Sequence, residues 1–301
     1  MIFKDLSQAI GNTPLLEVGI PGAYARVLLK LESFNPGGSA KDRVALSMIA
    51  DAEKRGLLKK GATIIEPTSG NTGVGLAWIG RVRGYRTILV MPDTMSVERR
   101  KLLSAYGAQV VLTPGALGMA ASIAEAERLH KEIPGSFIPS QFDNPANPAA
   151  HTATADEIVK DLGGVPDIFV ATTGTGGTVC GCAARFKQLR PSVRIVAVEP
   201  AESPLLTKGV AGPHIIQGIG ANFIPENYKA ELVDTVMDVK GEESMEGARA
   251  LVACGVLGGF SSGAAYFAAR TLALDTSNEG KTIVALLPDT GERYLSTELF
   301  G

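Results

Sequence analysis

The feature that most constrains this chain is a regular alternation of short β-branched runs with segments of helical periodicity. After Ser39, for example, Val44, Ala45 and Met48 recur at the spacing of one helix face. Strands that alternate with helices usually form parallel sheets with helices on both faces. The sequence therefore predicts an α/β protein with mostly parallel sheets. Its predicted buried strands are 27–31, 63–66, 87–91, 109–112, 168–171, 194–199, 232–239 and 282–287.

A stretch rich in asparagine and proline, residues 141–148, is the predicted boundary between two domains. It divides the chain almost in half, and a length of 301 residues is typical of about two domains. In open α/β sheets the ligand binds beyond the carboxyl ends of the strands, often between domains. The loops that follow strands are therefore where the chemistry is expected.

Charge and cysteine content exclude several classes of partner. Lys and Arg total 29 against 31 for Asp and Glu, without a basic block, so we expect neither nucleic acid nor an anionic membrane as partner. The apolar runs are too short to cross a membrane, and the N-terminus does not resemble a signal peptide. The three cysteines cannot form a disulfide framework, and Cys180 and Cys182 have no nearby His or Cys with which to bind zinc. We expect a cytoplasmic protein without a metal site.

Glycine is over-represented, with 35 residues where average usage gives about 21. Such an excess indicates tight turns or backbone that lies close to a ligand. In one glycine-containing loop, 34–43, Lys41 would lie in the first turn of a helix. The positive end of the helix dipole would lower the pKa of this lysine and favour the neutral amine that forms imines. A solvated lysine at a helix start is the alternative.

Three further loops are candidates, and the first two of them follow strands and lead into helices. In 66–73, Ser69, Asn71 and Thr72 place donors beside a helix N-terminus, which predicts a carboxylate or phosphate site; ordinary N-cap chemistry is the alternative. The glycine- and threonine-rich loop 172–178 predicts a phosphate site, with a flexible turn as the alternative. It matches neither the dinucleotide fingerprint nor the P-loop, which disfavours a dehydrogenase. The hydroxyls of 258–265 are weaker candidates for a ligand heteroatom.

A phosphate loop, a helix-start lysine and a carboxylate loop together suggest pyridoxal phosphate and an amino-acid substrate. In their order and spacing these motifs resemble the cysteine synthases (O-acetylserine sulfhydrylases), within the tryptophan synthase β-like, fold type II pyridoxal-phosphate enzymes. The resemblance extends from 10–14 to 291–296, and 212–220 is similar to the A-type enzymes. It implies two three-layer α/β/α domains with the active site in the cleft between them. The implied domains are a smaller mobile domain, 35–145, and a larger cofactor-anchoring domain, 1–34 plus 146–301.

The resemblance also implies a role for each loop. Lys41 would be the Schiff-base lysine and general acid/base, and Ser261 would hydrogen-bond the pyridine nitrogen. The residues implied to bind the phosphate are Gly174, Thr175, Gly176, Gly177 and Thr178. Those implied to hold the substrate carboxylate are Thr68, Ser69, Asn71, Thr72 and Gln141. Asn71 would also meet the cofactor's 3′ oxygen, and Gly218 would line the substrate entrance.

The implied reaction is a ping-pong β-replacement through an α-aminoacrylate, in which O-acetyl-L-serine and sulfide give L-cysteine and acetate. O-phosphoserine, cystathionine or cyanoalanine chemistry and serine/threonine dehydration remain alternatives. A homodimer is implied, and a non-enzymatic alternative is a binding partner of the serine acetyltransferase C-terminal tail. Ala40 and Phe260 stand where the family pattern has β-branched aliphatics, and Phe260 is a candidate for reshaping the pocket.

Overall fold

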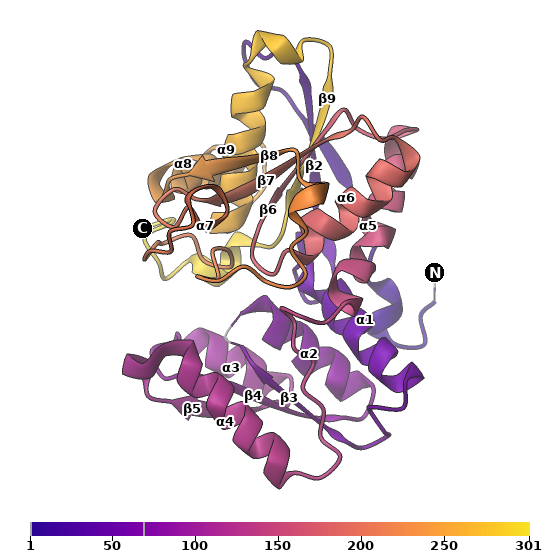
Figure 1. Cartoon of the computed structure of the whole chain (residues 1–301), viewed down its shortest axis with the longest axis vertical. Coiled ribbons are helices and arrows are strands. Elements are labelled where there is room, and N and C mark those ends of the chain that lie inside the picture. Colours follow the sequence, from indigo (N-terminus) through magenta and orange to yellow (C-terminus); the bar gives the residue numbers. More distant parts are fainter. Residues whose placement is uncertain (1, 69) are drawn as a thin grey trace. The chain divides into compact units, whose positions relative to one another are not determined.

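A computed structural model describes residues 2–68 and 70–301, and the chain divides into two compact units (Figure 1). The smaller unit contains residues 2–10 and Lys41–Ala146, and the larger contains Gly11–Ala40 and Asn147–Gly301. The smaller unit differs from the expected smaller domain, 35–145, because it includes residues 2–10 and begins its main segment at Lys41. Residues 35–40 group with the larger unit because they bond within it, as the Ala40 N–H does to the Pro288 carbonyl at 2.8 Å. Residues 2–10 group with the smaller unit, where the 3-10 helix Leu6–Ala9 packs against α2.

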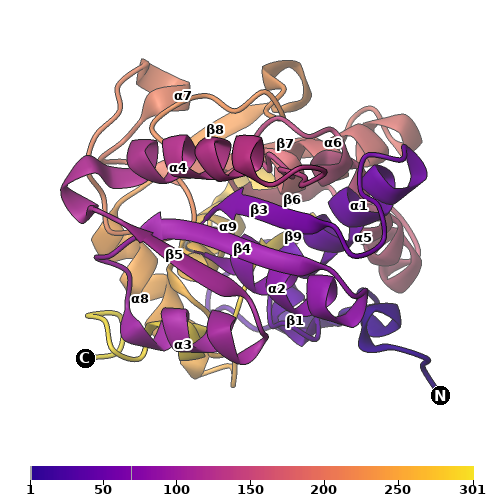
Figure 2. The ribbon, with the colours of Figure 1, turned by 90° about the horizontal axis from the view of Figure 1, so that it is seen from below.

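The smaller unit is built on a parallel three-stranded sheet in the order β3-β4-β5. Its strands are β3 (Thr63–Pro67), β4 (Arg86–Pro92) and β5 (Gln109–Thr113). Its helices are α1 (Lys41–Lys54), α2 (Asn71–Val82), α3 (Val97–Ala105) and α4 (Gly118–Glu132). Figure 2 shows α4 along one face of this sheet, with α2 and α3 on the other.

Alternation along the strands explains the three layers of this unit. Ile64 and Leu89 belong to the buried cluster formed with α1 and α2, whereas their neighbours Ile65 and Ile88 pack with Ala126 of α4. Successive side chains of a strand point to opposite faces, so a strand that is apolar at every position requires helices on both sides.

The larger unit contains a six-stranded sheet in the order β1-β2-β9-β6-β7-β8. Its strands are β1 (Leu15–Val18), β2 (Arg26–Leu31), β6 (Ile168–Thr172), β7 (Arg194–Pro200), β8 (Thr235–Val239) and β9 (Thr282–Leu287). Its helices are α5 (Ala146–Leu162), which begins on the last residue of the smaller unit, α6 (Gly177–Leu189), α7 (Leu205–Lys208), α8 (Gly241–Val252) and α9 (Phe260–Ala273). Every neighbouring pair is parallel except β1 with β2, which is antiparallel.

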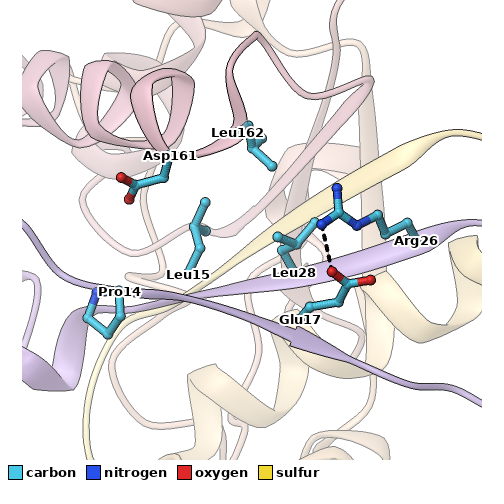
Figure 3. A pocket seen from close by; sticks show the side chains of 7 residues that line it. All are labelled: Pro14, Leu15, Glu17, Arg26, Leu28, Asp161 and Leu162. Atoms are coloured by element: carbon cyan, nitrogen blue, oxygen red, sulfur yellow. Dashed lines mark hydrogen bonds and ion pairs between the residues drawn. The ribbon is translucent and has the colours of Figure 1, made fainter.

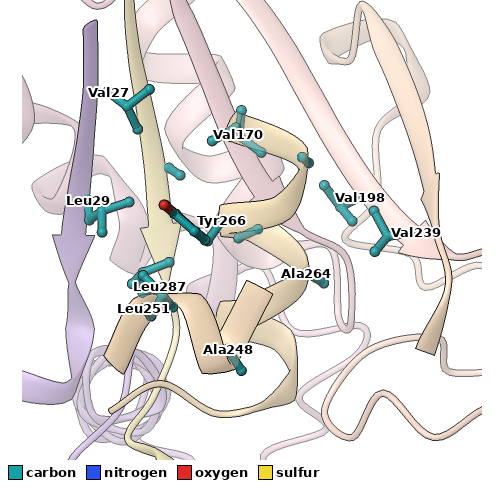
Figure 4. Close-up of a cluster of buried hydrophobic side chains, with 14 of the residues drawn as sticks. Val27, Leu29, Val170, Val198, Val239, Ala248, Leu251, Ala264, Tyr266 and Leu287 are labelled. Carbon is teal, nitrogen blue, oxygen red and sulfur yellow. The ribbon is translucent and has the colours of Figure 1, made fainter. Parts of the chain in front are cut away.

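Helices also cover both faces of this sheet. Val27 and Val170 meet α8 and α9 on one face, in the cluster drawn in Figure 4. Leu28 and Phe169 point the other way, toward α5 and α6. The register aligns Leu31 of β2 with Leu287 of β9. The loops that follow these two strands therefore leave the sheet at the same edge, which is also the edge where β6 ends.

The predicted fold class is confirmed: both units are three-layered, and their sheets are mostly parallel. Gly56, Gly84 and Gly107 lie two residues beyond the ends of α1, α2 and α3 and have positive φ angles of 71°, 79° and 87°, which is typical of helix ends. The predicted strand 232–239 begins later, at Thr235, because Ala230–Leu232 forms a 3-10 turn. Strand β1 was not predicted. Within the described residues, every helix is too short or too polar to span a membrane.

Candidate active site

Lys41 is the first residue of α1, as the sequence predicts. Its backbone is held close to α2, because a Cβ added at Gly75 would lie only 3.0 Å from the Lys41 carbonyl oxygen and 2.9 Å from the Ala45 Cβ. The next residue, Asp42, is buried and accepts a 3.0 Å hydrogen bond from the indole N–H of Trp78 on α2. The start of α1 is therefore fixed against α2 by close backbone packing and one buried hydrogen bond.

The predicted carboxylate loop connects β3 to α2. Thr68 is buried, and its N–H bonds the Val90 carbonyl at 3.0 Å, which extends the β3–β4 pairing by one residue. Ser69 lies outside the described residues. Gly70 is the N-cap of α2, and Asn71 and Thr72 open the helix. Hydroxyl and amide groups thus lie beside the first N–H groups of a helix, an arrangement that binds anions.

Gln141 joins this loop from the far end of the smaller unit's sequence. Its side-chain oxygen accepts a 2.5 Å hydrogen bond from the Thr72 hydroxyl. Its backbone N–H donates to Glu66 Oε1 at 3.2 Å, and the Ser140 N–H donates to Oε2 of the same carboxylate at 3.1 Å. Burial raises the pKa of Glu66 to about 7. The structure therefore brings together Thr68, Thr72 and Gln141 and adds Glu66, which the sequence reading had placed only at a strand end.

The predicted phosphate loop connects β6 to α6. Gly176 is the N-cap of α6 and has a φ of +77°, a conformation that favours glycine. A Cβ at this residue would also lie 2.7 Å from the Tyr228 nitrogen. The Thr175 hydroxyl accepts from the Asn147 side chain at 2.9 Å, and the Thr178 hydroxyl lies 3.1 Å from a ring nitrogen of buried His151. The loop is thus held in shape from α5.

The residues of this loop fit a phosphate group. The sequence 172–178 contains four threonines and three glycines and no acidic side chain. The buried hydroxyl of Thr173 has no hydrogen-bond partner, and buried polar groups are normally satisfied. The first N–H groups of α6 also lack partners within the helix, as at every helix start, and the helix dipole adds positive potential there. An anion with several acceptor oxygens would satisfy these groups.

Ser261 and Gly218 lie with this loop in the larger unit. A Cβ added at Gly174 would come within 2.5 Å of the Gly218 carbonyl oxygen, and one added at Gly218 would lie 4.0 Å from the Ser261 Oγ. Ser261 is buried in the first turn of α9. The larger unit therefore brings together the phosphate loop, the predicted entrance glycine and the predicted pyridine partner.

Phe260 occupies the protein core. It is buried, and its ring meets the edge of Tyr294 with centroids 5.5 Å apart and an interplanar angle of 89°. The Tyr294 hydroxyl donates to buried Asp289 at 2.6 Å. Phe260 therefore supports, by packing, the helix start that carries Ser261, and its effect on the pocket stays a prediction.

A cavity of about 470 Å³ lies elsewhere in the larger unit (Figure 3). It opens between β1, β2 and the end of α5, and its walls are Pro14, Leu15, Glu17, Arg26, Leu28, Asp161 and Leu162. Its charged groups include the Glu17–Arg26 ion pair, whose side chains are about half exposed. None of the predicted site residues lines it, so we do not assign the cavity to catalysis. Nor do the described residues contain a group of three His, Cys, Asp or Glu side chains placed to hold a metal ion.

Comparisons with known proteins cover almost the whole chain. The family model described as pyridoxal-phosphate dependent enzyme matches residues 6–289. A protein named cysteine synthase from Staphylococcus aureus is 47% identical, with 98% of this chain and 96% of that protein covered. The crystal structure of a cysteine synthase from Entamoeba histolytica has a TM-score of 0.97 at 47% identity, covering 100% of this chain and 91% of that one. The structure of an O-ureido-L-serine synthase has a TM-score of 0.96 at 44% identity, covering 100% and 96%.

Proposed function

The chain belongs to the family of pyridoxal-phosphate dependent enzymes, and from that membership we propose that it forms L-cysteine from O-acetyl-L-serine and sulfide. The relatives from Staphylococcus aureus and Entamoeba histolytica are named cysteine synthase. The predicted family, the cofactor pyridoxal 5′-phosphate and the enzyme class are confirmed. The observation that carries the proposed reaction is the pair of helix starts described above, one with Lys41 and one with a glycine–threonine phosphate loop.

The larger unit would hold the cofactor. Gly174, Thr175, Gly176, Gly177 and Thr178 would bind the phosphate, and the Thr173 hydroxyl would gain a partner there. The neutral hydroxyl of Ser261 would donate a hydrogen bond to the unprotonated pyridine nitrogen. When bound, pyridoxal phosphate supplies an electron-withdrawing ring that allows the α-proton and the β-substituent of an amino acid to leave.

The smaller unit would supply the reacting base and the substrate clamp. The Lys41 amine would hold the cofactor covalently and, once displaced, take the α-proton of the substrate and later return it. Thr68, Ser69, Asn71, Thr72 and Gln141 would bind the substrate carboxylate, and Asn71 would also meet the cofactor's 3′ oxygen. Gly218 of the larger unit would line the entrance.

The reaction balances without a further co-reactant. The Cβ–O bond of O-acetylserine breaks, and acetate leaves with the bonding electrons. Hydrosulfide then forms the Cβ–S bond, and the α-proton taken by Lys41 returns to Cα. Holding the carboxylate in the helix-start loop orients Cα toward the base, and orientation of this kind contributes a large part of catalysis.

A titration of the purified holoenzyme tests the proposal. Addition of O-acetylserine should shift the visible absorbance, and sulfide should restore it with formation of cysteine. O-phosphoserine and serine, added separately, compare the alternative donors; a faster response to one of these than to O-acetylserine would reassign the substrate. The Lys41→Ala variant should show no shift of the visible absorbance and should not turn over O-acetylserine. Normal turnover by this variant would refute the role of Lys41.

We also propose a homodimer in the cytoplasm that is able to dock the C-terminal tail of a serine acetyltransferase. Family resemblance supports the dimer and the tail, and the three free thiols fit a reducing compartment. Light scattering of the holoenzyme tests the homodimer. Competition between a tail peptide and O-acetylserine tests docking of the tail, and a reporter fusion tests the compartment. The smaller unit is proposed to be the mobile one, which hydrogen exchange with and without substrate would test.

A further inference from the structure

We propose that Glu66 is a positioning residue that aims Gln141 at the substrate carboxylate. This inference rests on the proposed function, in which Gln141 and Thr72 bind that carboxylate. Glu66 itself lies in β3, two residues before Thr68, and is 1% exposed. It would act through Gln141 and would not touch the substrate.

The carboxylate of Glu66 holds the backbone that carries Gln141. One carboxylate oxygen accepts the Ser140 N–H at 3.1 Å, and the other accepts the Gln141 N–H at 3.2 Å. Two successive amides therefore share one side chain, which fixes both the position and the direction of the peptide between them. Hydrogen bonds from amides to an ionised carboxylate are stronger than those between neutral groups.

The backbone at this point adopts a conformation that needs such support. Ser140 has a φ of +54°, a left-handed conformation that is uncommon for residues other than glycine. Its carbonyl accepts the N–H groups of Asp143 and Asn144 at 3.0 Å each, so a tight turn follows at once. A strained residue of this kind persists only where its surroundings hold it in place. Glu66 supplies two of the bonds that do so.

The fixed backbone sets the side chain. Gln141 is 7% exposed, and its Oε1 accepts the Thr72 hydroxyl at 2.5 Å. A continuous set of hydrogen bonds thus runs from Glu66 through Gln141 to Thr72, at the start of α2. A shift of the 140–141 peptide would therefore move two groups proposed to bind the substrate carboxylate, the Gln141 side-chain amide and the Thr72 hydroxyl.

The charge state of Glu66 determines how many amides it can accept. In the part of the chain that the structure describes, no Lys or Arg forms an ion pair with it, and an unpaired buried carboxylate is unfavourable. Burial, and to a smaller extent the charge of Asp143, raise its pKa, the two amides lower it, and the resulting pKa is about 7. Protonation places a hydrogen on one oxygen, which then competes with an amide N–H. The positioning should therefore weaken as the pH falls through about 7.

Glu199 provides a matched control within the same chain. It is also buried, also precedes a proline at the end of a strand, and also accepts two successive backbone amides, from Leu206 and Thr207 at 2.7 and 2.9 Å. Those amides belong to the short helix α7, and none of the proposed site residues lies there. Substitution of Glu199 reproduces the loss of a buried glutamate without disturbing Gln141.

The experiment compares Glu66→Gln, Glu199→Gln and the wild-type holoenzyme. Glutamine keeps the shape of the Glu66 side chain, but its amide nitrogen cannot accept a hydrogen bond from the backbone N–H that it would face. We expect the KM for O-acetylserine to rise about tenfold or more in Glu66→Gln, the size of one lost charge-assisted hydrogen bond, with the cofactor content unchanged. The ratio of the two KM values should shrink toward one as the pH falls from 8 to 6, because the wild-type carboxyl becomes neutral. Glu199→Gln should keep the wild-type KM.

A ligand pair separates this proposal from the proposed function. Binding of L-alanine and of L-alaninamide is measured by quenching of Trp78, the only tryptophan. The proposal is supported if Glu66→Gln binds alanine more weakly than wild type but binds alaninamide as wild type does. It is overturned if both proteins bind alanine equally, or if the variant loses affinity for alanine and alaninamide to the same extent. If Glu66→Gln alone binds alanine more weakly but the wild type does not turn over O-acetylserine, the proposed reaction fails and the role of Glu66 stands. If Glu66→Gln does not fold, Asp143→Asn should move the pH dependence of KM to lower pH, and an unmoved dependence refutes the proposal.

Discussion

Replacement of Glu66 by glutamine should change how the stability of the protein depends on pH. The ordinary pKa of this carboxyl is 4.5, and burial raises it to about 7 in the folded chain. The folded state therefore holds its proton more tightly than the unfolded state. The stabilisation this provides is fully present below about pH 4.5 and is lost as the pH rises through about 7. Above that pH the carboxylate is ionised in both states, and its contribution no longer changes.

The size of the effect follows from the shift. A rise from 4.5 to about 7, at about 1.4 kcal/mol per pKa unit, gives about 3 kcal/mol in all, of which about 2.5 kcal/mol falls between pH 5 and pH 8. Glutamine does not titrate, so the same interval should contribute nothing from this site in the variant. The difference in free energy of unfolding, variant minus wild type, should therefore rise by about 2.5 kcal/mol from pH 5 to pH 8. Every other titrating group cancels in that difference.

Urea unfolding followed by tryptophan fluorescence measures this difference. Trp78 lies in the same compact unit as Glu66, so its signal reports the unfolding of that unit. Asp143→Asn serves as the second arm, because the charge of Asp143 raises the pKa of Glu66, and its removal should move the transition to lower pH. A variant-minus-wild-type difference that stays constant between pH 5 and pH 8 would refute the reasoning, since Glu66 would then titrate as an exposed carboxyl does.

Three further substitutions have defined outcomes. Thr173→Val removes a buried hydroxyl that lacks a partner, so the apoprotein should gain about 1 kcal/mol in urea unfolding while cofactor affinity falls in equilibrium dialysis. Gly75→Ala places a Cβ 3.0 Å from the Lys41 carbonyl, which should lower the free energy of unfolding by about 1–3 kcal/mol. Tyr294→Phe keeps the ring but removes the 2.6 Å bond to Asp289; it should cost about 1–2 kcal/mol in the same assay, and an unchanged stability would contradict the role given to that hydroxyl.

Much of the fold is predictable because the spacing of apolar residues along a strand or helix shows which of its faces are buried. The residues of β3 and β6 are apolar at successive positions, which requires helices on both sides, and both strands lie within a residue of their predicted bounds. The position of Lys41 at a helix start is also local information, carried by the glycines before it and the periodic residues after it. Strand β1 was missed because it is a partly exposed edge strand of only four residues, too short to show a clear periodicity.

The supporting residues of the candidate site were not predictable in this way. Glu66 reads as a polar strand end, and only the fold shows that its partners lie 74 and 75 residues away. Phe260 reads as a departure from a family pattern, whereas its partner Tyr294 comes from a loop beyond β9. Periodicity shows which face of an element is buried but not which distant residue it meets. Loop motifs therefore predict which groups touch ligands, whereas the side chains that hold those loops are found only in the tertiary structure.

The two buried glutamates make the same arrangement, a carboxylate that accepts two successive backbone amides. In one place it stabilises the path of the chain, and in the other it positions a proposed site residue. Glu66 and Glu199 each precede the proline that ends a parallel strand, and each accepts two successive backbone amides from a segment outside that strand. A carboxylate at that point satisfies two amides at once, at the expense of burying a charge. At Glu199 the amides begin a short helix, so the bonds serve only the path of the chain. At Glu66 they carry Gln141, and the pKa of about 7 shows that desolvation outweighs the two bonds there. The burial of Glu66 is therefore unfavourable for stability, whereas its two bonds hold the backbone of Gln141 beside the proposed substrate loop.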